Sequence, residues 1–232
     1  IGNYSFVYCK ELENAILNIN GVYVGEGAFS YCEKLEVIEN LNKVKHIGDY
    51  AFAGSGLTNR GQTVTFPLTL KKIGDGAFMH NAFKAVTIPF HIKKLGNYAF
   101  AHNELTTVTF GNGVKTIPSG AFFANAITNL TLPKDLITIE DTAFMHNRLS
   151  TMTLPLTVQI VGHAAFAHNE LTSVSLPSVH TIGDDAFIHN QLIHFDVPHK
   201  VNDMPIGALM DNPLQSIKVE GSETKLLNTG SS

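Results

Sequence analysis

The 232-residue chain contains no tryptophan and only two cysteines, and charged residues make up just 16% of it. Two cysteines cannot form a disulfide scaffold, and no cluster of cysteine and histidine has the spacing of a zinc site. No apolar run approaches the ~18–20 residues of a membrane-spanning helix, and the first residues do not read as a secretion signal. The formal charge of −4 gives no general attraction to nucleic acid. We therefore expect neither membrane insertion nor nucleic-acid binding.

Sequence motifs of enzymes and of cofactor-binding proteins are also missing. The chain has no G-x-S-x-G, no H-E-x-x-H, no phosphate-binding loop and no EF-hand pattern. The string Gly74-Asp75-Gly76 lacks the third glycine of a dinucleotide site. We therefore expect a protein that is not an enzyme, with no catalytic residues, no cofactor and no metal site. Hydrophobic residues nevertheless make up 44% of the chain, which is enough for a sizeable core.

The sequence does contain a periodic phenylalanine. Nine of the fifteen phenylalanines recur at intervals of 21 to 26 residues, and Leu209 continues the series. A unit of this length cannot bury its apolar side alone, so neighbouring units must stack and share one core. The ten marker positions are Phe6, Phe29, Phe52, Phe78, Phe100, Phe122, Phe144, Phe166, Phe187 and Leu209.

Each repeat has the same order of segments, which residues 95–117 illustrate. The string GNYAFAHN predicts a one- or two-turn helix, because it starts with a capping residue and ends at an asparagine that tolerates the left-handed conformation. The alternating segment from Leu105 to Phe110 predicts a short strand with one buried face, and proline often closes this strand. A second apolar pair, Val114 and Ile117, predicts another brief extended segment.

Two strands and a short helical turn per repeat predict a leucine-rich-repeat solenoid, a right-handed coil of short parallel strands with about ten repeats. We expect residues 1–220 to form this solenoid and residues 221–232 to form a polar tail or linker. The longest repeat carries four extra residues, 59–62, which we expect to bulge just ahead of a strand.

The repeated pattern I-G-x-x-A-F-x-x-(N/C)-x-L-x-x-V-x-L-P resembles the BspA-type (Treponema pallidum-like) leucine-rich repeats of bacterial surface proteins, from residue 1 to about 220. The chain departs from the commonest pattern by using asparagine where many members have cysteine, and only Cys9 and Cys32 keep the cysteine. The resemblance implies an extracellular or cell-surface bacterial protein that binds host or microbial proteins or glycans. A spacer that carries other domains outward, with no ligand of its own, is the alternative.

Two sets of residues are candidates for a ligand-binding surface. Lysines cluster in the second extended segment of four successive repeats, where they would attract an anionic glycan or an acidic protein patch, although an ordinary solvated face explains them as well. Threonines occupy outward positions of the main strand and would form an adjoining flat polar sheet. The lysines are Lys45, Lys71, Lys72, Lys93, Lys94 and Lys115, and the threonines are Thr87, Thr109, Thr131 and Thr153.

A histidine recurs two residues after the marker in five repeats, at His80, His102, His146, His168 and His189. Stacked coils would align these imidazoles along one edge. The column is either a pH-sensitive or metal-capturing strip or a surface residue copied by duplication, and we favour duplication.

Three residues after the marker, asparagines recur and are expected to form a buried ladder whose amides bond to the backbone. The four central members are Asn103, Asn125, Asn147 and Asn169. Cys9 and Cys32 hold the same place in adjacent coils, within the distance that a disulfide tolerates. We favour two buried free thiols in the asparagine position over a disulfide.

Overall fold

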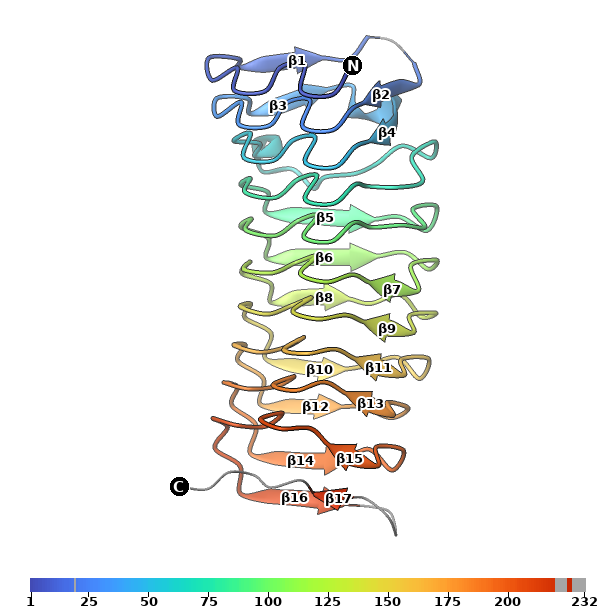
Figure 1. The fold of residues 1–232 in the computed structure, drawn as a ribbon, viewed down its shortest axis with the longest axis vertical. Helices are drawn as coiled ribbons and strands as arrows, with labels where there is room; N and C mark the ends of the chain where they lie inside the picture. The colour runs from blue at the N-terminus through green and yellow to red at the C-terminus, as the bar shows by residue number, and fades with distance from the viewer. Residues whose placement is uncertain (19, 220–224, 227–232) are drawn as a thin grey trace.

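The computed structural model describes residues 1–18, 20–219 and 225–226, and it shows a solenoid of about nine stacked turns (Figure 1). The chain winds from one end of the stack to the other without returning, so each coil contacts mainly the coil before it and the coil after it. All of the assigned strand pairs are parallel and join neighbouring coils. The predicted architecture of a leucine-rich-repeat coil is confirmed.

One set of strands, the main strands, follows the asparagine position of each repeat and contains the predicted alternation of apolar and polar residues. Their register is strictly periodic, since Thr87 pairs with Thr109 and Thr109 pairs with Thr131. In the coil with the insertion, an isolated bridge from Val64 to Val86 replaces the strand. The main strands are β1 (Asn14–Ile16), β3 (Val37–Glu39), β5 (Ala85–Ile88), β6 (Thr107–Phe110), β8 (Asn129–Thr131), β10 (Thr151–Thr153), β12 (Ser173–Ser175), β14 (His194–Val197) and β16 (Ser216–Val219).

A second set of shorter strands follows a turn after the main strands, except after β5, where the isolated bridge from Lys72 to Lys94 takes the place of a strand. This turn commonly begins at the proline. The amide of Ile92, for example, donates to the carbonyl of Pro89. The second strands are β2 (Val22–Val24), β4 (Val44–Ile47), β7 (Thr116–Ile117), β9 (Thr138–Ile139), β11 (Ile160–Val161), β13 (Thr181–Ile182), β15 (Asp203–Met204) and β17 (Lys225–Leu226). Of the predicted tail, residues 221–224 and 227–232 lie outside the described residues.

The two sets of strands enclose the core between them. Val108 and Phe110 of β6 are buried, and so are Val114 and Ile117 around β7. In Figure 1 the second strands lie in front of the main strands, and the two sets belong to different sheets. Because both sheets turn their apolar side chains toward one core, their outward side chains point away from each other.

The segment around each marker is not the short helix that the sequence predicted. Within the described residues, the helical segments are two 3-10 turns, η1 (Leu41–Lys43) and η2 (Asn59–Gly61). Around the marker, the amides of Tyr98, Phe100 and His102 donate to carbonyls of the next coil instead of closing helical turns. The helix prediction is wrong because hydrogen bonding between coils replaces hydrogen bonding along the segment.

Overlapping tight turns form this segment and hold two of its residues in the left-handed conformation. The residue two before the marker and the residue two after it have φ between +50° and +69° in all ten coils. We call them the first and the second turn column. The asparagine was expected to adopt the left-handed conformation, but the residue directly before it adopts this conformation instead. The first column is Tyr4, Gly27, Tyr50, Gly76, Tyr98, Gly120, Thr142, Ala164, Asp185 and Gly207, and the second is Tyr8, Tyr31, Gly54, His80, His102, Ala124, His146, His168, His189 and Asp211.

The marker phenylalanines form a continuous stack through the core. From Phe6 to Phe187, successive rings lie 5.1 to 5.8 Å apart, nearly parallel to one another. Phe100, Phe122 and Phe144 are completely buried, as the sequence predicted. This stack is the shared core that a single repeat could not provide.

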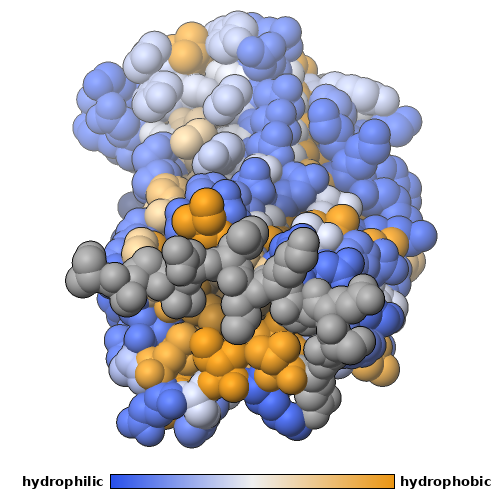
Figure 2. Space-filling view, turned by 60° about the horizontal axis from the view of Figure 1, so that its bottom comes forward, coloured by the Kyte–Doolittle hydropathy of each residue, from blue (hydrophilic) through white to orange (hydrophobic). Residues whose placement is uncertain are grey.

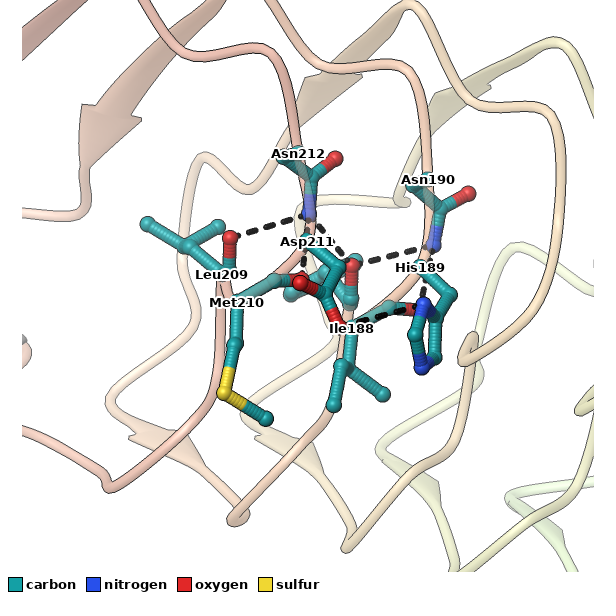
Figure 3. A network of polar contacts seen from close by, with 8 residues as sticks. Ile188, His189, Asn190, Leu209, Met210, Asp211 and Asn212 are labelled. Carbon is teal, nitrogen blue, oxygen red and sulfur yellow. Dashed lines mark hydrogen bonds and ion pairs between the residues drawn. The ribbon is translucent and has the colours of Figure 1, made fainter. Parts of the chain in front are cut away.

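The asparagine ladder is also confirmed. The amide nitrogen of Asn147 donates to the carbonyls of Phe122 (2.9 Å) and Phe144 (3.0 Å), and its oxygen accepts from the amide of Ile127 (3.0 Å). Each asparagine thereby joins its own coil to the preceding one. Figure 3 shows the same bonds at the C-terminal end, where Asn212 donates to the carbonyls of Leu209 and Met210 and Asn190 donates to that of Ile188.

The two cysteines are free, and they differ in burial. Cys32 is buried, and its thiol donates to the carbonyl of Phe6 at 3.0 Å, in the place of an asparagine amide. Burial raises the pKa of this thiol, so it is poorly reactive. Cys9 is exposed, which corrects the expectation of two buried thiols, because no described coil stacks on it from the N-terminal side.

The four extra residues 59–62 form the expected bulge. They build η2 at the surface, where the side chain of Thr58 accepts a hydrogen bond from the amide of Arg60. The stack of coils continues past this bulge, since Ile47 and Ile73 still pair. An insertion in a turn therefore leaves the core intact.

The phenylalanine stack predicts a large stability difference between two similar substitutions. Phe122→Ala should lower the free energy of unfolding by about 3–5 kcal/mol, because it leaves a cavity in the core. Phe90→Ala removes a ring that is 60% exposed and should have a much smaller effect. Urea unfolding followed by circular dichroism measures both, and equal losses would contradict the stacked core.

The asparagine ladder predicts a graded series at one position. Asn147→Ala leaves the buried amide of Ile127 without its partner and removes one of the two asparagine donors from each of the carbonyls of Phe122 and Phe144. It should cost roughly 1–3 kcal/mol of stability. Asn147→Ser should cost less, because Ser55 occupies this position in its own coil and still donates to the carbonyl of Phe29. The exposed Asn129→Ala is the control. If urea unfolding shows that Asn147→Ser is no more stable than Asn147→Ala, the hydrogen bonds of the ladder do not stabilise the stack.

Candidate binding surfaces

The six lysines form one exposed strip along the sheet of second strands, which we call the lysine strip. Lys45 lies in β4, and the amide of Lys93 donates to the carbonyl of Lys71 in the preceding coil. Lys72 and Lys94 pair directly in a parallel bridge. The predicted alignment of these lysines in successive coils is therefore confirmed. The whole strip is exposed and comprises Lys45, Lys71, Lys72, Lys93, Lys94 and Lys115.

Local contacts hold parts of the lysine strip in place but leave most of its charge unpaired. The ammonium groups of Lys71 and Lys93 donate to the carbonyls of Leu68 and Phe90, each at 3.0 Å. Lys72 lies 3.8 Å from the carboxylate of Asp49. Across the described part of the chain, the other five lysines have no carboxylate within 4.0 Å. The strip is therefore a local positive patch on a chain of net charge −4.

An open groove of about 380 Å³ lies beside the N-terminal end of the lysine strip. Tyr23 and His46 line it with rings stacked 5.7 Å apart, and Glu26, Asp49 and Lys72 add charges of both signs. The ammonium group of Lys45, next along the strip, lies 5.9 Å from the centre of the Tyr23 ring. At this end the strip therefore combines cationic, acidic and aromatic groups.

The threonines lie on the other sheet. Thr87, Thr109 and Thr131 stack in register on β5, β6 and β8, and Thr153 pairs with Ser175. Thr131 and Thr153 are exposed, whereas Thr87 and Thr109 are half-buried. Since the two sheets face away from each other, the expectation that the threonine columns adjoin the lysines is wrong. They form two separate surfaces.

The histidines of the second turn column stack face to face. His80 and His102 are 4.3 Å apart, as are His146 and His168, and His168 and His189. Where Ala124 interrupts the column, Phe123 stands edge-on to His102 and to His146. In Figure 3, His189 lies beside Asp211, with the imidazole 3.3 Å from the carboxylate.

Stacking changes the acid–base behaviour of two histidines. Burial lowers the pKa of His102, and the neighbouring His80 lowers it further. Burial also lowers the pKa of His168, which lies between His146 and His189. No group of three or more histidine, cysteine or acidic side chains within the described ranges is placed to hold a metal ion. The stack therefore makes His102 and His168 harder to protonate than a free imidazole.

The tyrosines are a further set of surface residues, which the predicted binding surfaces do not include. All six are exposed, and five of them lie in the two turn columns, at Tyr4, Tyr8, Tyr31, Tyr50 and Tyr98. An alignment on the marker phenylalanines would have found them, since they hold fixed positions two residues before or after it. Their exposure, in contrast, depends on how the coils stack.

The end of the solenoid formed by the last coils is apolar, whereas its flanks are mostly hydrophilic (Figure 2). The exposed apolar residues of these coils include Ile206, Met210, Ile217 and Val219. Ile217 and Val219 are in register with the buried Phe195 and Val197 of the preceding coil, and they are exposed because no further described coil stacks on them. We therefore do not count this patch among the candidate binding surfaces.

A family model described as BspA type leucine-rich repeat region matches residues 1–126 and 115–229, in six copies. A comparison with curated proteins gave no match. Of the helical segments that the structure describes, none has the length and apolar character needed to span a bilayer.

Solved structures of bacterial leucine-rich repeat proteins share the fold at low sequence identity. A leucine-rich repeat protein of Bacteroides ovatus is 22% identical with a TM-score of 0.50, over 96% of this chain and 78% of its own. A leucine-rich cell surface protein of Faecalibacterium prausnitzii is 20% identical with a TM-score of 0.56, over 96% and 93%. The pneumococcal vaccine antigen PcpA is 18% identical with a TM-score of 0.51, over 93% and 60%.

The lowered pKa values of His102 and His168 predict that acid destabilises the fold. An unfolded histidine titrates near pH 6.5, so below this pH the unfolded chain binds protons that the folded chain does not yet bind. The free energy of unfolding should therefore fall as the pH drops through about 6.5. Urea unfolding at about pH 7.5 and about pH 5.5 measures this decrease.

Removing the two histidines should make the decrease smaller. His102→Asn/His168→Asn keeps residues that tolerate the left-handed conformation but eliminates both titrating groups. His163→Asn/His199→Asn, which removes two exposed histidines outside the column, is the matched control. If all three proteins lose the same stability between the two pH values, the histidine stack does not cause the acid sensitivity.

Proposed function

The chain belongs to the family of BspA-type leucine-rich repeat proteins, and on that premise we propose that it is the ligand-binding repeat module of a bacterial cell-surface protein. Its partner is an extracellular protein or an anionic glycan, held along an extended surface without catalysis. The module acts as an adhesion element outside the cell, where it meets polysaccharides and proteins rather than nucleic acid.

Two structural neighbours support the location. One is described as a leucine-rich cell surface protein and another as a vaccine antigen. Both share the coil that this chain forms. A surface location also suits a fold that exposes long flat faces and needs no closed pocket to bind a polymer.

The lysine strip carries the binding proposal. Coils repeat every ~4.8 Å along the stack, so a linear polyanion lying along the strip meets several ammonium groups in succession. The net negative charge of the rest of the chain repels such a ligand elsewhere and directs it to the strip. Each exposed contact is weak and screened by salt, so affinity comes from several contacts made together.

Heparin is a suitable probe because it is a linear, strongly anionic glycan. The wild type should bind it at low salt, with affinity that falls steeply toward physiological salt. The variant Lys71→Gln/Lys72→Gln/Lys93→Gln/Lys94→Gln should bind more weakly and with a shallower salt dependence. Surface plasmon resonance at several salt concentrations gives both quantities.

A matched variant separates the lysine strip from net charge. Lys10→Gln/Lys34→Gln/Lys84→Gln/Lys134→Gln removes four lysines elsewhere, three of which pair with glutamates. It should bind heparin nearly as well as the wild type. If both variants lose heparin affinity equally, the overall charge of the protein and not the lysine strip accounts for binding. If none of the three proteins binds heparin, the result would favour a spacer that has no anionic ligand.

A further inference from the structure

The first turn column alternates between tyrosine and glycine over its first six coils. Tyr50 precedes Gly76 and Tyr98 precedes Gly120, after Tyr4 and Gly27 at the N-terminal end. A side chain added at Gly76 would meet the Tyr50 ring at 2.5 Å, and one added at Gly120 would meet the Tyr98 ring. Each tyrosine therefore lies across the glycine of the next coil, which supports one face of the ring.

Left-handed positions favour glycine, yet aromatic residues occupy them here. Both Tyr50 and Tyr98 have φ of +54°. Glycine adopts this conformation at no steric cost, because it has no side chain, whereas the Cβ atom of tyrosine is crowded there. Strain of this kind persists where the surrounding structure fixes it, and it clusters at ligand-binding sites. Backbone amides of Tyr50 and Tyr98 donate to the next coil and fix both positions.

The rings remain open to solvent on the side away from the glycines. Tyr50 and Tyr98 are 47% and 44% exposed, and Tyr31 in the second turn column is 45% exposed. The second turn column adds the stacked pair His80 and His102 on the same turn segments. Together these rings form an aromatic surface at the edge between the two sheets, which meets the lysine strip where Lys72 lies beside Asp49.

Acidic groups lie next to this aromatic surface. Asp49 and Asp75 directly precede the first turn column, and each uses one carboxylate oxygen to accept from the backbone amide of the next coil. The other oxygen of each carboxylate remains an acceptor. Glu26 accepts a hydrogen bond from the Tyr4 hydroxyl. These carboxylates repel a polyanion and offer acceptors to a neutral ligand that is rich in hydroxyl groups.

We propose that the tyrosines of the turn columns, centred on Tyr31, Tyr50 and Tyr98, bind a neutral polysaccharide. The apolar C–H face of a pyranose ring packs on each tyrosine, and sugar hydroxyls donate to Asp49 and Asp75. Successive tyrosines of the first column are two coils apart, about 10 Å, so the ligand is a polymer that presents an equivalent ring at each. The site does not depend on the lysine strip and remains if that strip binds nothing.

The experiment uses the absence of tryptophan, since tyrosine then provides the intrinsic fluorescence of the protein. A panel of neutral polysaccharides (mannan, xyloglucan, galactan, soluble starch and mixed-linkage glucan) is tested by affinity gel electrophoresis and by tyrosine emission. At least one polymer should retard the wild type and change its emission, and raising the salt concentration should leave both effects unchanged.

The test variant is Tyr50→Gly/Tyr98→Gly, which places in both coils the residue that Gly27 and Gly76 already provide. It should fold with unchanged or higher stability and bind the same polymer about tenfold or more weakly. The control Phe90→Asn removes an exposed ring outside the turn columns and outside the groove that Asp49 lines, and it should bind like the wild type.

Three results would overturn the proposal. Either no polymer of the panel retards the wild type, or the test variant binds as tightly as the wild type, or the control loses binding to the same extent. The wild type could instead bind immobilised extracellular matrix proteins and no polysaccharide, with this binding lost in the test variant. That result would assign the surface to a protein partner and would also overturn the glycan proposal.

Discussion

Hydrogen bonds between the turn segments of neighbouring coils are the constraint on which the rest of this structure depends. The amides of Tyr98, Phe100 and His102 all donate forward to the next coil, and Asn103 donates back to the coil before it. A turn segment tied in both directions cannot form a helix or shift its register. It brings the marker rings into contact, fixes the two left-handed columns, and sets the spacing at which every surface residue repeats.

Repetition in register makes each residue type a neighbour of its own copies, and the consequences differ with its chemistry. Phenylalanine gains, because parallel rings bury one another. Asparagine gains, because every amide finds partners in two coils. Lysine and histidine instead meet like charges. Salt screens this repulsion for Lys72 and Lys94 at the surface. Within the histidine stack, burial lowers the pKa of His168, and the neighbouring His146 and His189 lower it further. Columns of ionisable residues are therefore where the stack loses stability and becomes responsive to solvent.

The three surfaces of the coil differ in chemistry, and two of them meet where Lys72 lies beside Asp49. The sheet of second strands carries the lysine strip, the sheet of main strands carries hydroxylic columns, and the turn edge carries aromatic rings next to carboxylates. A ligand that fits one surface is poorly matched to the other two, since Lys93 attracts anions while Asp75 repels them. Because each surface runs along the stack, all three suit extended ligands, and weak contacts are strengthened by their number.

The sequence by itself determined the repeat, the core and the buried ladder, because these depend on a local pattern that recurs at a fixed period. Phe122, Val108 and Asn147 could each be assigned from their place in the repeat, and so could the alignment of Lys71 with Lys93. Only the tertiary structure decided the left-handed turns, because local signals for a helix cannot reveal that amides will bond to another coil. It also decided that Thr109 faces away from the lysines, and that Tyr98 is exposed because a glycine lies beneath its ring in the next coil.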